Sequence, residues 1–300
     1  MKWRQLRDAS FLNLKLCVLG PRRGASIATP SSAAWLRAWD SQGVHRTGTE
    51  GDAAGANWIA AEAEKMGFRP VQSAFAFDRV DPIETYLDVD GRRFAGVPVF
   101  DAPGTEGIEA PIGPDGIEIV PLAPSAVYSG EYRRLRTDAR HRALVVLCQG
   151  TPPGMGLLNA EQFGHEYGAP AIHIDDPAAL AFAGRPARVV SRRNVVQATA
   201  HNVVVDIGPR DSALPPLVVM TPRSSWWQST AGRGGGLVCF LEGLRTLSTE
   251  PIGRRVVLTA NSGHELGHLG LDAFLADRVG WDRPGGAVWV HFGANIGATG

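Results

Sequence analysis

The fold class follows from one segment of the sequence, Arg255-Val-Val-Leu-Thr-Ala-Asn-Ser-Gly-His-Glu-Leu-Gly-His-Leu-Gly270. It opens with an apolar, β-branched run that is typical of a buried strand. A glycine turn follows, and apolar residues then recur at helical spacing. We therefore expect a strand over residues 255–259 and a helix over residues 263–276.

Similar patterns flank this stretch on both sides. Further strands are expected over 202–206, 217–220 and 287–292, and a helix over 237–247 after a tight glycine turn at 232–236. Strands that alternate with helices predict a central mixed or parallel sheet flanked by helices. The predicted fold class is therefore α/β.

The segment 31–68 reads as helical, with a break at 43–51. Asp52 is expected to cap a helix over 53–66, because its carboxylate can accept from the first free amides. An alternating strand pattern follows over 68–77.

The pattern changes between residues 81 and 196, where Pro and Gly interrupt short strand-like pieces. This favours a β-rich insert whose strands are separate from the main sheet. We expect a buried strand over 143–147, a short helix over 159–167 and a strand over 169–174. The predicted domains are an N-terminal extension (1–30), an α/β domain (31–80 and 197–300) and the insert (81–196).

Composition excludes several classes of protein. The chain has 300 residues, with 30 basic and 30 acidic side chains, and its net charge of zero argues against a nucleic-acid partner. No window approaches the length of uncharged apolar sequence that a transmembrane segment needs. The three cysteines are far apart, which argues against a disulfide framework. The compartment stays open: the chain is compatible with a soluble cytoplasmic protein or an exported one.

The motif His264-Glu-Leu-Gly-His268 matches HExxH. On a helix, residues four apart share a face, so both imidazoles could bind one zinc ion while Glu265 acts as general base on bound water. The candidate metal ligands are therefore His264, Glu265 and His268, and the candidate catalytic residue is Glu265. Third ligands could come from Asp272, Asp282 or His291.

A structural interpretation of the same residues needs no metal. Ser262 and Glu265 have the spacing of a capping box, in which each side chain bonds the other's backbone amide. Both interpretations stay open at this stage.

The order of motifs resembles the co-catalytic zinc aminopeptidases and glutamate carboxypeptidases, a family whose degenerate relatives include the transferrin receptor ectodomain. The motifs that carry the resemblance are His45-Arg-Thr-Gly-Thr-Glu-Gly51, Ala143-Leu-Val-Val-Leu-Cys-Gln-Gly150, His201-Asn-Val-Val-Val205, Gly232 to Gly236, and Ser262 to Gly270. The resemblance implies a protease-associated insert at 81–196. It also implies that the C-terminal part of the sheet is missing after Gly300, which would leave an exposed edge prone to self-association.

The resemblance further implies two zinc ions held by His and carboxylate ligands. Most ligand positions hold other residues: the segment after strand 217–220 reads Thr221-Pro-Arg-Ser224, and the turn expected to carry the bridging Asp holds Gly232 and Arg233. His264 stands at the base position, and only Glu265 keeps a ligand. We therefore expect no two-zinc site, because Arg223 or Arg233 would repel Zn²⁺.

Three functions remain compatible with the sequence. The first is a divergent aminopeptidase-like metallohydrolase that acts on peptides or small amides, with zinc at a remodelled site. The second is a non-catalytic, peptidase-like binding protein. The third is a single-zinc HExxH metallopeptidase. The hydrolases would take a peptide or small-molecule substrate, and the binding protein would take a peptide, glycan or protein. Bound zinc would favour a hydrolase, and protein free of metal would favour the non-catalytic relative.

Overall fold

The computed structural model of the protein describes residues 31–123, 126, 129–148, 156–160, 163–209, 213–250 and 252–293. The extension expected over 1–30 lies outside these residues. The chain forms two units. The α/β unit combines the described residues up to Ala76 with Thr199–His264 and those from His268 onward. The insert unit comprises Phe77–Ala198 together with Glu265–Gly267.

A mixed sheet forms the centre of the α/β unit. Its strands β9 (Leu217–Pro222), β10 (Val256–Asn261) and β11 (Val288–His291) are parallel to one another, in the order β11-β9-β10. On the far side of β10, the last part of β8 (Pro186–Ile207) joins in antiparallel register. The predicted strands over 217–220 and 255–259 are confirmed.

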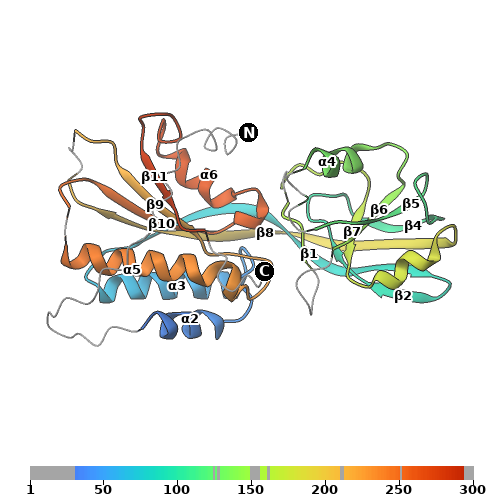
Figure 1. The fold of residues 1–300 in the computed structure, drawn as a ribbon, viewed down its shortest axis with the longest axis horizontal. Helices are drawn as coiled ribbons and strands as arrows, with labels where there is room; N and C mark the ends of the chain where they lie inside the picture. Colours follow the sequence, from blue (N-terminus) through green and yellow to red (C-terminus); the bar gives the residue numbers. More distant parts are fainter. Residues whose placement is uncertain are drawn as a thin grey trace. The chain divides into compact units, whose positions relative to one another are not determined.

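Helices cover both faces of this sheet, which confirms the α/β prediction (Figure 1). The helices α2 (Ser32–Asp40), α3 (Glu50–Lys65) and α5 (Gly235–Thr249) pack on one face, and α6 (Leu269–Ala276) packs on the other. None of the helices in the described ranges is long and apolar enough to cross a membrane.

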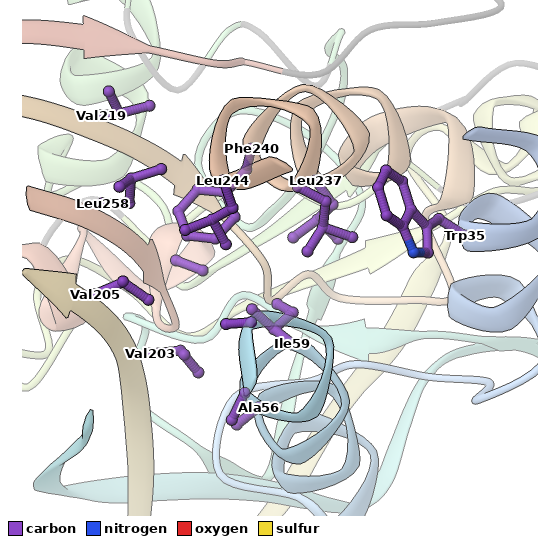
Figure 2. Packing of buried hydrophobic residues seen from close by; sticks show 14 of the residues in the cluster. Trp35, Ala56, Ile59, Val203, Val205, Val219, Leu237, Phe240, Leu244 and Leu258 are labelled. Carbon is purple, nitrogen blue, oxygen red and sulfur yellow. The ribbon is translucent and has the colours of Figure 1, made fainter. Parts of the chain in front are cut away.

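The strand β10 shows why the sheet holds two apolar layers. Val256 and Leu258 face α3 and α5, while Val257 faces α6, because successive strand residues point to opposite faces. Figure 2 shows the larger layer, in which Ile59 of α3 and Phe240 of α5 approach the sheet. Full burial of one such side chain stabilises the fold by roughly 1.5–3 kcal/mol.

Two long strands pass through both units. β1 (Val71–Val89) pairs with β2 (Arg92–Ala95), and β8 pairs with β4 (Thr105–Pro111). These strands belong to the same hydrogen-bonded sheet as β9, β10 and β11. The predicted separation of the insert strands from the main sheet is therefore wrong for β2 and β4. The strand predicted over 68–77 begins at Val71 and continues to Val89, well into the region that the sequence assigned to the insert.

A second sheet lies within the insert unit, in the order β3-β7-β6-β5. Its strands are β3 (Val97–Pro98), β5 (Ile117–Pro121), β6 (Ala143–Leu147) and β7 (Ala171–Ile174), and its helices are α4 (Gly130–Thr137) and the 3-10 helix η2 (Pro177–Phe182). The strand predicted over 143–147 is confirmed, and every residue of it is buried. The helix predicted over 159–167 is wrong, since none of its described residues is helical. Gly164 there has a φ of 86°, outside the helical region.

The glycine-rich segment before α5 is not the tight turn that we predicted. Thr230–Gly234 form one π-type helical turn that leads directly into α5. Glycine is needed for close approach: a Cβ on Gly236 would lie 2.6 Å from the carbonyl oxygen of Phe292 and 2.6 Å from Oγ1 of Thr221. The start of α5 therefore lies directly against the ends of β9 and β11.

Two substitutions in α5 test this packing. Gly236→Ala is expected to lower the free energy of unfolding by about 1–3 kcal/mol, because backbone must move to admit the methyl group. Gly243→Ala in the same helix is the control, since its Cβ would meet only Leu258 at 3.9 Å. That variant is expected to gain about 0.5–1 kcal/mol from helix propensity. Urea unfolding measures both, and equal signs would contradict the packing argument.

Candidate functional site

The segments that follow β9, β10 and β11 come together at one edge of the main sheet. The three strands are parallel, so their carboxyl ends lie side by side. In open α/β sheets, ligands bind outside this edge. The sequence motif His264–His268 follows β10 directly and therefore starts at the place where the fold favours a site.

A buried ion pair lies beside this edge. Nη1 of Arg223 donates to Oδ1 of Asp52 at 2.7 Å and to the carbonyl oxygen of Asp52 at 2.6 Å. Nη2 of Arg223 donates to the carbonyl oxygen of His201. Arg223 and Asp52 are 0% and 1% exposed. A pair buried this deeply needs further hydrogen bonds to offset its loss of hydration.

Those further bonds converge on the Asp52 carboxylate. The hydroxyl of Ser262 lies 2.9 Å from both carboxylate oxygens, and the amide of Gly48 donates to Oδ2 at 2.9 Å. Asp52 was predicted to cap α3, and this is wrong: Thr49 holds the cap position. The carboxylate lies in the first turn of the helix, where the positive end of the helix dipole also favours its charge.

The turn after β10 is held by the same network. The amide of Ser262 donates to Oδ1 of Asn202 at 3.2 Å. The amide of Gly263 donates to Oγ of Ser224 at 2.7 Å and to Oγ1 of Thr47 at 3.1 Å. The hydroxyl of Ser262 hydrogen-bonds the carboxylate of Asp52. The capping-box interpretation, in which this hydroxyl bonds the amide of Glu265, therefore does not describe its role.

The HExxH motif does not lie on one helix, which corrects the helix predicted over 263–276. His264–Leu266 form a single 3-10 turn, and α6 begins only at Leu269. His268 has a φ of 67°, which breaks the helix between the two turns. The amide of Leu269 donates to the carbonyl oxygen of Gly263 at 3.1 Å. Within the insert unit, the carbonyl oxygen of Glu265 accepts from the amide of Ala160 at 2.9 Å.

The structure nevertheless brings His264 and His268 together. Their ring centroids are 4.4 Å apart and the rings are nearly perpendicular, at 82°. The helical i, i+4 geometry on which the zinc prediction rested is absent. Within the described ranges, no group of three or more His, Cys, Asp or Glu side chains could hold a metal ion. None of the expected third ligands, Asp272, Asp282 and His291, therefore completes a site there.

All three imidazoles of this edge favour their neutral form. Burial, followed by the charge of Arg233 and the neighbouring imidazoles, holds the pKa of His264 well below its usual range. Burial, His291 and Arg233 lower the pKa of His268 to about 4. Burial and Arg233 also lower the pKa of His291. Burial is the largest cause in all three cases, and Arg233 lowers the pKa further in each.

The guanidinium of Arg233 is fixed by two carbonyl groups. Its Nε donates to the carbonyl oxygen of Ser224 at 2.7 Å, and its Nη1 donates to that of Gly232 at 2.8 Å. Of the two arginines expected to repel a metal ion, Arg223 is paired with Asp52. Glu265 is 1% exposed and belongs by its contacts to the insert unit.

Sequence reasoning missed the polar network around Asp52. Asp52 and Arg223 are 171 residues apart, and no spacing rule joins them. The one available signal was composition: Thr47, Ser224 and Ser262 stand where strand and helix ends meet, which is where short polar side chains bond backbone amides.

The fold is that of the zinc aminopeptidases. The zinc aminopeptidase BSAP from Bacillus subtilis superimposes with a TM-score of 0.69 at 17% identity, over 87% of this chain and 67% of its own. The aminopeptidase from Aneurinibacillus sp. strain AM-1 gives a TM-score of 0.61 at 14% identity, over 87% of this chain and 70% of its own.

A peptidase M28 precursor from Shewanella amazonensis SB2B also matches, with a TM-score of 0.63 at 11% identity, over 90% of this chain and 71% of its own. No protein-family model matches the sequence, and no curated protein matches it. The superpositions show that the fold is shared. At identities this low, they assign no functional role to any residue of this chain.

The donor set of this chain does not fit a pair of zinc ions. Zinc in such sites is bound by imidazole and carboxylate groups. Where the resemblance expects ligands after β9 and before α5, the chain has Thr221, Arg223, Gly232 and Arg233. A hydroxyl, two guanidinium groups and a glycine cannot replace anionic ligands. The resemblance implies a further ligand after β11, at Ala294, which lies outside the described residues.

Loss of the buried pair should destabilise the protein strongly. Asp52→Asn leaves the Arg223 charge buried without its anion, and we expect a loss of about 3–5 kcal/mol in the free energy of unfolding. Asp206→Asn is the control, because Asp206 pairs with Arg255 at a site where both side chains are 25% exposed. That change is expected to lose less than about 1 kcal/mol. Similar losses in both variants, measured by urea unfolding, would contradict the central role of Asp52.

The low pKa of His268 predicts a pH dependence of stability. In the unfolded chain, a histidine binds a proton with a pKa of about 6.5. In the folded chain, the pKa of His268 is about 4, so the unfolded state binds more protons between these pH values. The contribution of neutral His268 is therefore present above pH about 6.5 and is lost as the pH falls toward 4. We expect His268→Asn, which tolerates the left-handed backbone, to flatten the decline in this window.

The exposed His165 provides the control for this experiment. His165→Asn is expected to leave the decline in stability between these pH values nearly unchanged. If His268→Asn also leaves it unchanged, His268 is not held neutral by the fold. Urea unfolding at a series of pH values measures the decline in all three proteins.

Proposed function

We propose that this chain uses the aminopeptidase fold to bind peptides without two-zinc chemistry. The observation that carries the proposal is the residue set at the carboxyl ends of β9, β10 and β11, where Thr221, Arg223, Gly232 and Arg233 stand at positions that the resemblance assigns to metal ligands. A site for two divalent cations needs anionic ligands at this place, and the residues present have the opposite character. Peptides are the substrates of the aminopeptidases that share the fold, and we extend that ligand class to this chain.

A divergent hydrolase is the second candidate. Its support is the contact between His264 and His268, whose imidazoles are neutral and could act as bases or metal ligands. Glu265 lies between them in the sequence and is buried. The break in the helix at His268 counts against the single-zinc HExxH alternative, because that chemistry requires both histidines on one helical face.

Metal analysis and a peptidase assay separate the two candidates. After dialysis, we expect the protein to retain no stoichiometric zinc and to show no turnover of a panel of aminoacyl and peptide substrates. Two equivalents of retained zinc per chain would refute the proposal.

Glu265→Gln resolves the case in which turnover is found. If Glu265 is a general base, this variant should lose about 10²-fold or more in kcat while it keeps the size of the side chain. Such a loss would establish the hydrolase. Equal turnover by wild type and variant would exclude catalysis by Glu265.

We also propose an assignment for the insert and a route of self-association. We assign residues 81–196 to a protease-associated-like domain on the motif order alone. Among the described residues, β11 pairs with β9 and forms one end of the sheet. Self-association through this strand stays a prediction, which analytical ultracentrifugation would test.

A further inference from the structure

We propose that the insert unit carries a binding site for one sugar ring, in a pocket between the start of β4 and the middle of β8. The pocket has a volume of about 240 Å³. Its walls are formed by two short runs of residues, 104–106 and 191–193. Both runs belong to the insert unit, so the site is independent of the peptide binding proposed for the carboxyl ends of β9, β10 and β11.

A bulge in β4 lies beside the pocket. Thr105 is paired with Ser191 and Ile108 with Val189, so β4 has one residue more than β8 between these pairs. The amide of Gly107, inside the bulge, donates to Oγ1 of Thr105 at 3.1 Å. Bulges of this kind redirect side chains and are frequent next to active sites. The bulge therefore accounts for a pocket between two strands that otherwise pair regularly.

The lining favours a polar ligand without net charge. Neither run contains an apolar or aromatic side chain. Nε of Arg192 donates to Oε2 of Glu106 at 2.8 Å, and its Nη1 donates to Oε2 of Glu84 at 3.0 Å. Nη2 of Arg193 donates to Oε1 of Glu166. Both guanidinium groups are thus paired with carboxylates, which leaves no excess charge to attract an ionic ligand.

The pocket offers both donors and acceptors of hydrogen bonds. The carboxylate of Glu106 only accepts, the guanidinium groups only donate, and the hydroxyl groups of Thr105 and Ser191 can do either. A sugar ring is uncharged, and each of its hydroxyl groups both donates and accepts. It can therefore bond every kind of group in the lining, whereas an anion would face Glu106 without a proton to donate. The volume of the pocket suits one ring rather than a chain of rings.

One hydroxyl of the lining lacks a partner among the described residues. Ser191 is 1% exposed, and its Oγ is buried without a hydrogen bond to any of them. Buried polar atoms are normally paired with protein, water or ligand, because an unpaired one costs free energy. Since Ser191 lines the pocket, a hydroxyl group of the ligand can supply the missing bond.

Gly104 keeps the pocket open. A Cβ on this residue would lie 2.9 Å from Nε of Arg193 and 3.0 Å from the carbonyl oxygen of Ser191. The side chain of Arg193 is only 10% exposed, and its Nη1 donates to the carbonyl oxygen of Ala102 at 2.8 Å. A methyl group at position 104 would therefore occupy space within the lining or displace Arg193 from it.

The test uses the full chain and four uncharged probes, D-glucose, D-galactose, D-mannose and N-acetyl-D-glucosamine. We expect at least one of them to bind with a Kd of about 1 mM or lower in an NMR titration. The chemical-shift changes should centre on the backbone amides of the two runs that line the pocket. Because the probes carry no charge, the affinity should be the same at low and high salt.

Two variants assign the binding to the pocket. Ser191→Ala removes a hydroxyl without a partner among the described residues, so stability should not fall while affinity for the sugar falls about threefold to tenfold. Gly104→Ala should weaken binding about tenfold or more, because the methyl group crowds the lining. Gly130→Ala is the control in the same unit, since a Cβ there would meet nothing within 4 Å. Urea unfolding establishes that each variant is folded.

The outcomes separate a sugar site from the alternatives. Binding of none of the four sugars overturns the proposal. Shift changes that lie outside the pocket also overturn it, as does an affinity that both Ser191→Ala and Gly104→Ala leave unchanged. Binding of acetate or phosphate in place of a sugar, with an affinity that falls as salt rises, would assign the pocket to an anion instead.

Discussion

The buried ion pair between Asp52 and Arg223 is the interaction on which the α/β unit depends. It joins the first turn of α3 to the residue after β9, and through Ser262 it reaches the turn after β10. Neither charge could be buried alone, because an unpaired ion loses its hydration without compensation. The pair therefore requires all three segments to be in place together, and it sets the position of the turn that carries His264.

This constraint also explains how two arginines can lie close to one edge of a sheet. Asp52 neutralises Arg223 inside the protein, so that this charge does not reach the imidazoles in full. Arg233 is held by neutral carbonyl groups and acts on the histidines. At the carboxyl ends of β9 and β10 this chain therefore carries hydroxyl, imidazole and guanidinium groups, of which one guanidinium is neutralised by Asp52.

The sequence predicted the regular elements better than the site. Apolar runs such as 143–147 and 255–259 were sufficient to place buried strands, because burial on both faces leaves a continuous pattern. The helix over 263–276 failed because bonds from Leu269 to Gly263 and the left-handed backbone of His268 override helical spacing. The pair of Asp52 with Arg223 could not be read at all, since nothing local relates residues 171 positions apart.

The two long strands have a consequence for the order in which the chain can fold. The insert unit is nearly continuous in sequence, so it can form from comparatively local contacts as soon as it leaves the ribosome. The α/β unit must wait, because β8 finds its partner β10 only when residues 256–261 have been synthesised. Until then β8, whose other neighbour in the sheet is β1, lacks its partner on the β10 side, and this strand edge is exposed to association with other chains. Synthesis of this protein therefore includes an interval in which chaperone binding to residues 203–207 would favour correct assembly.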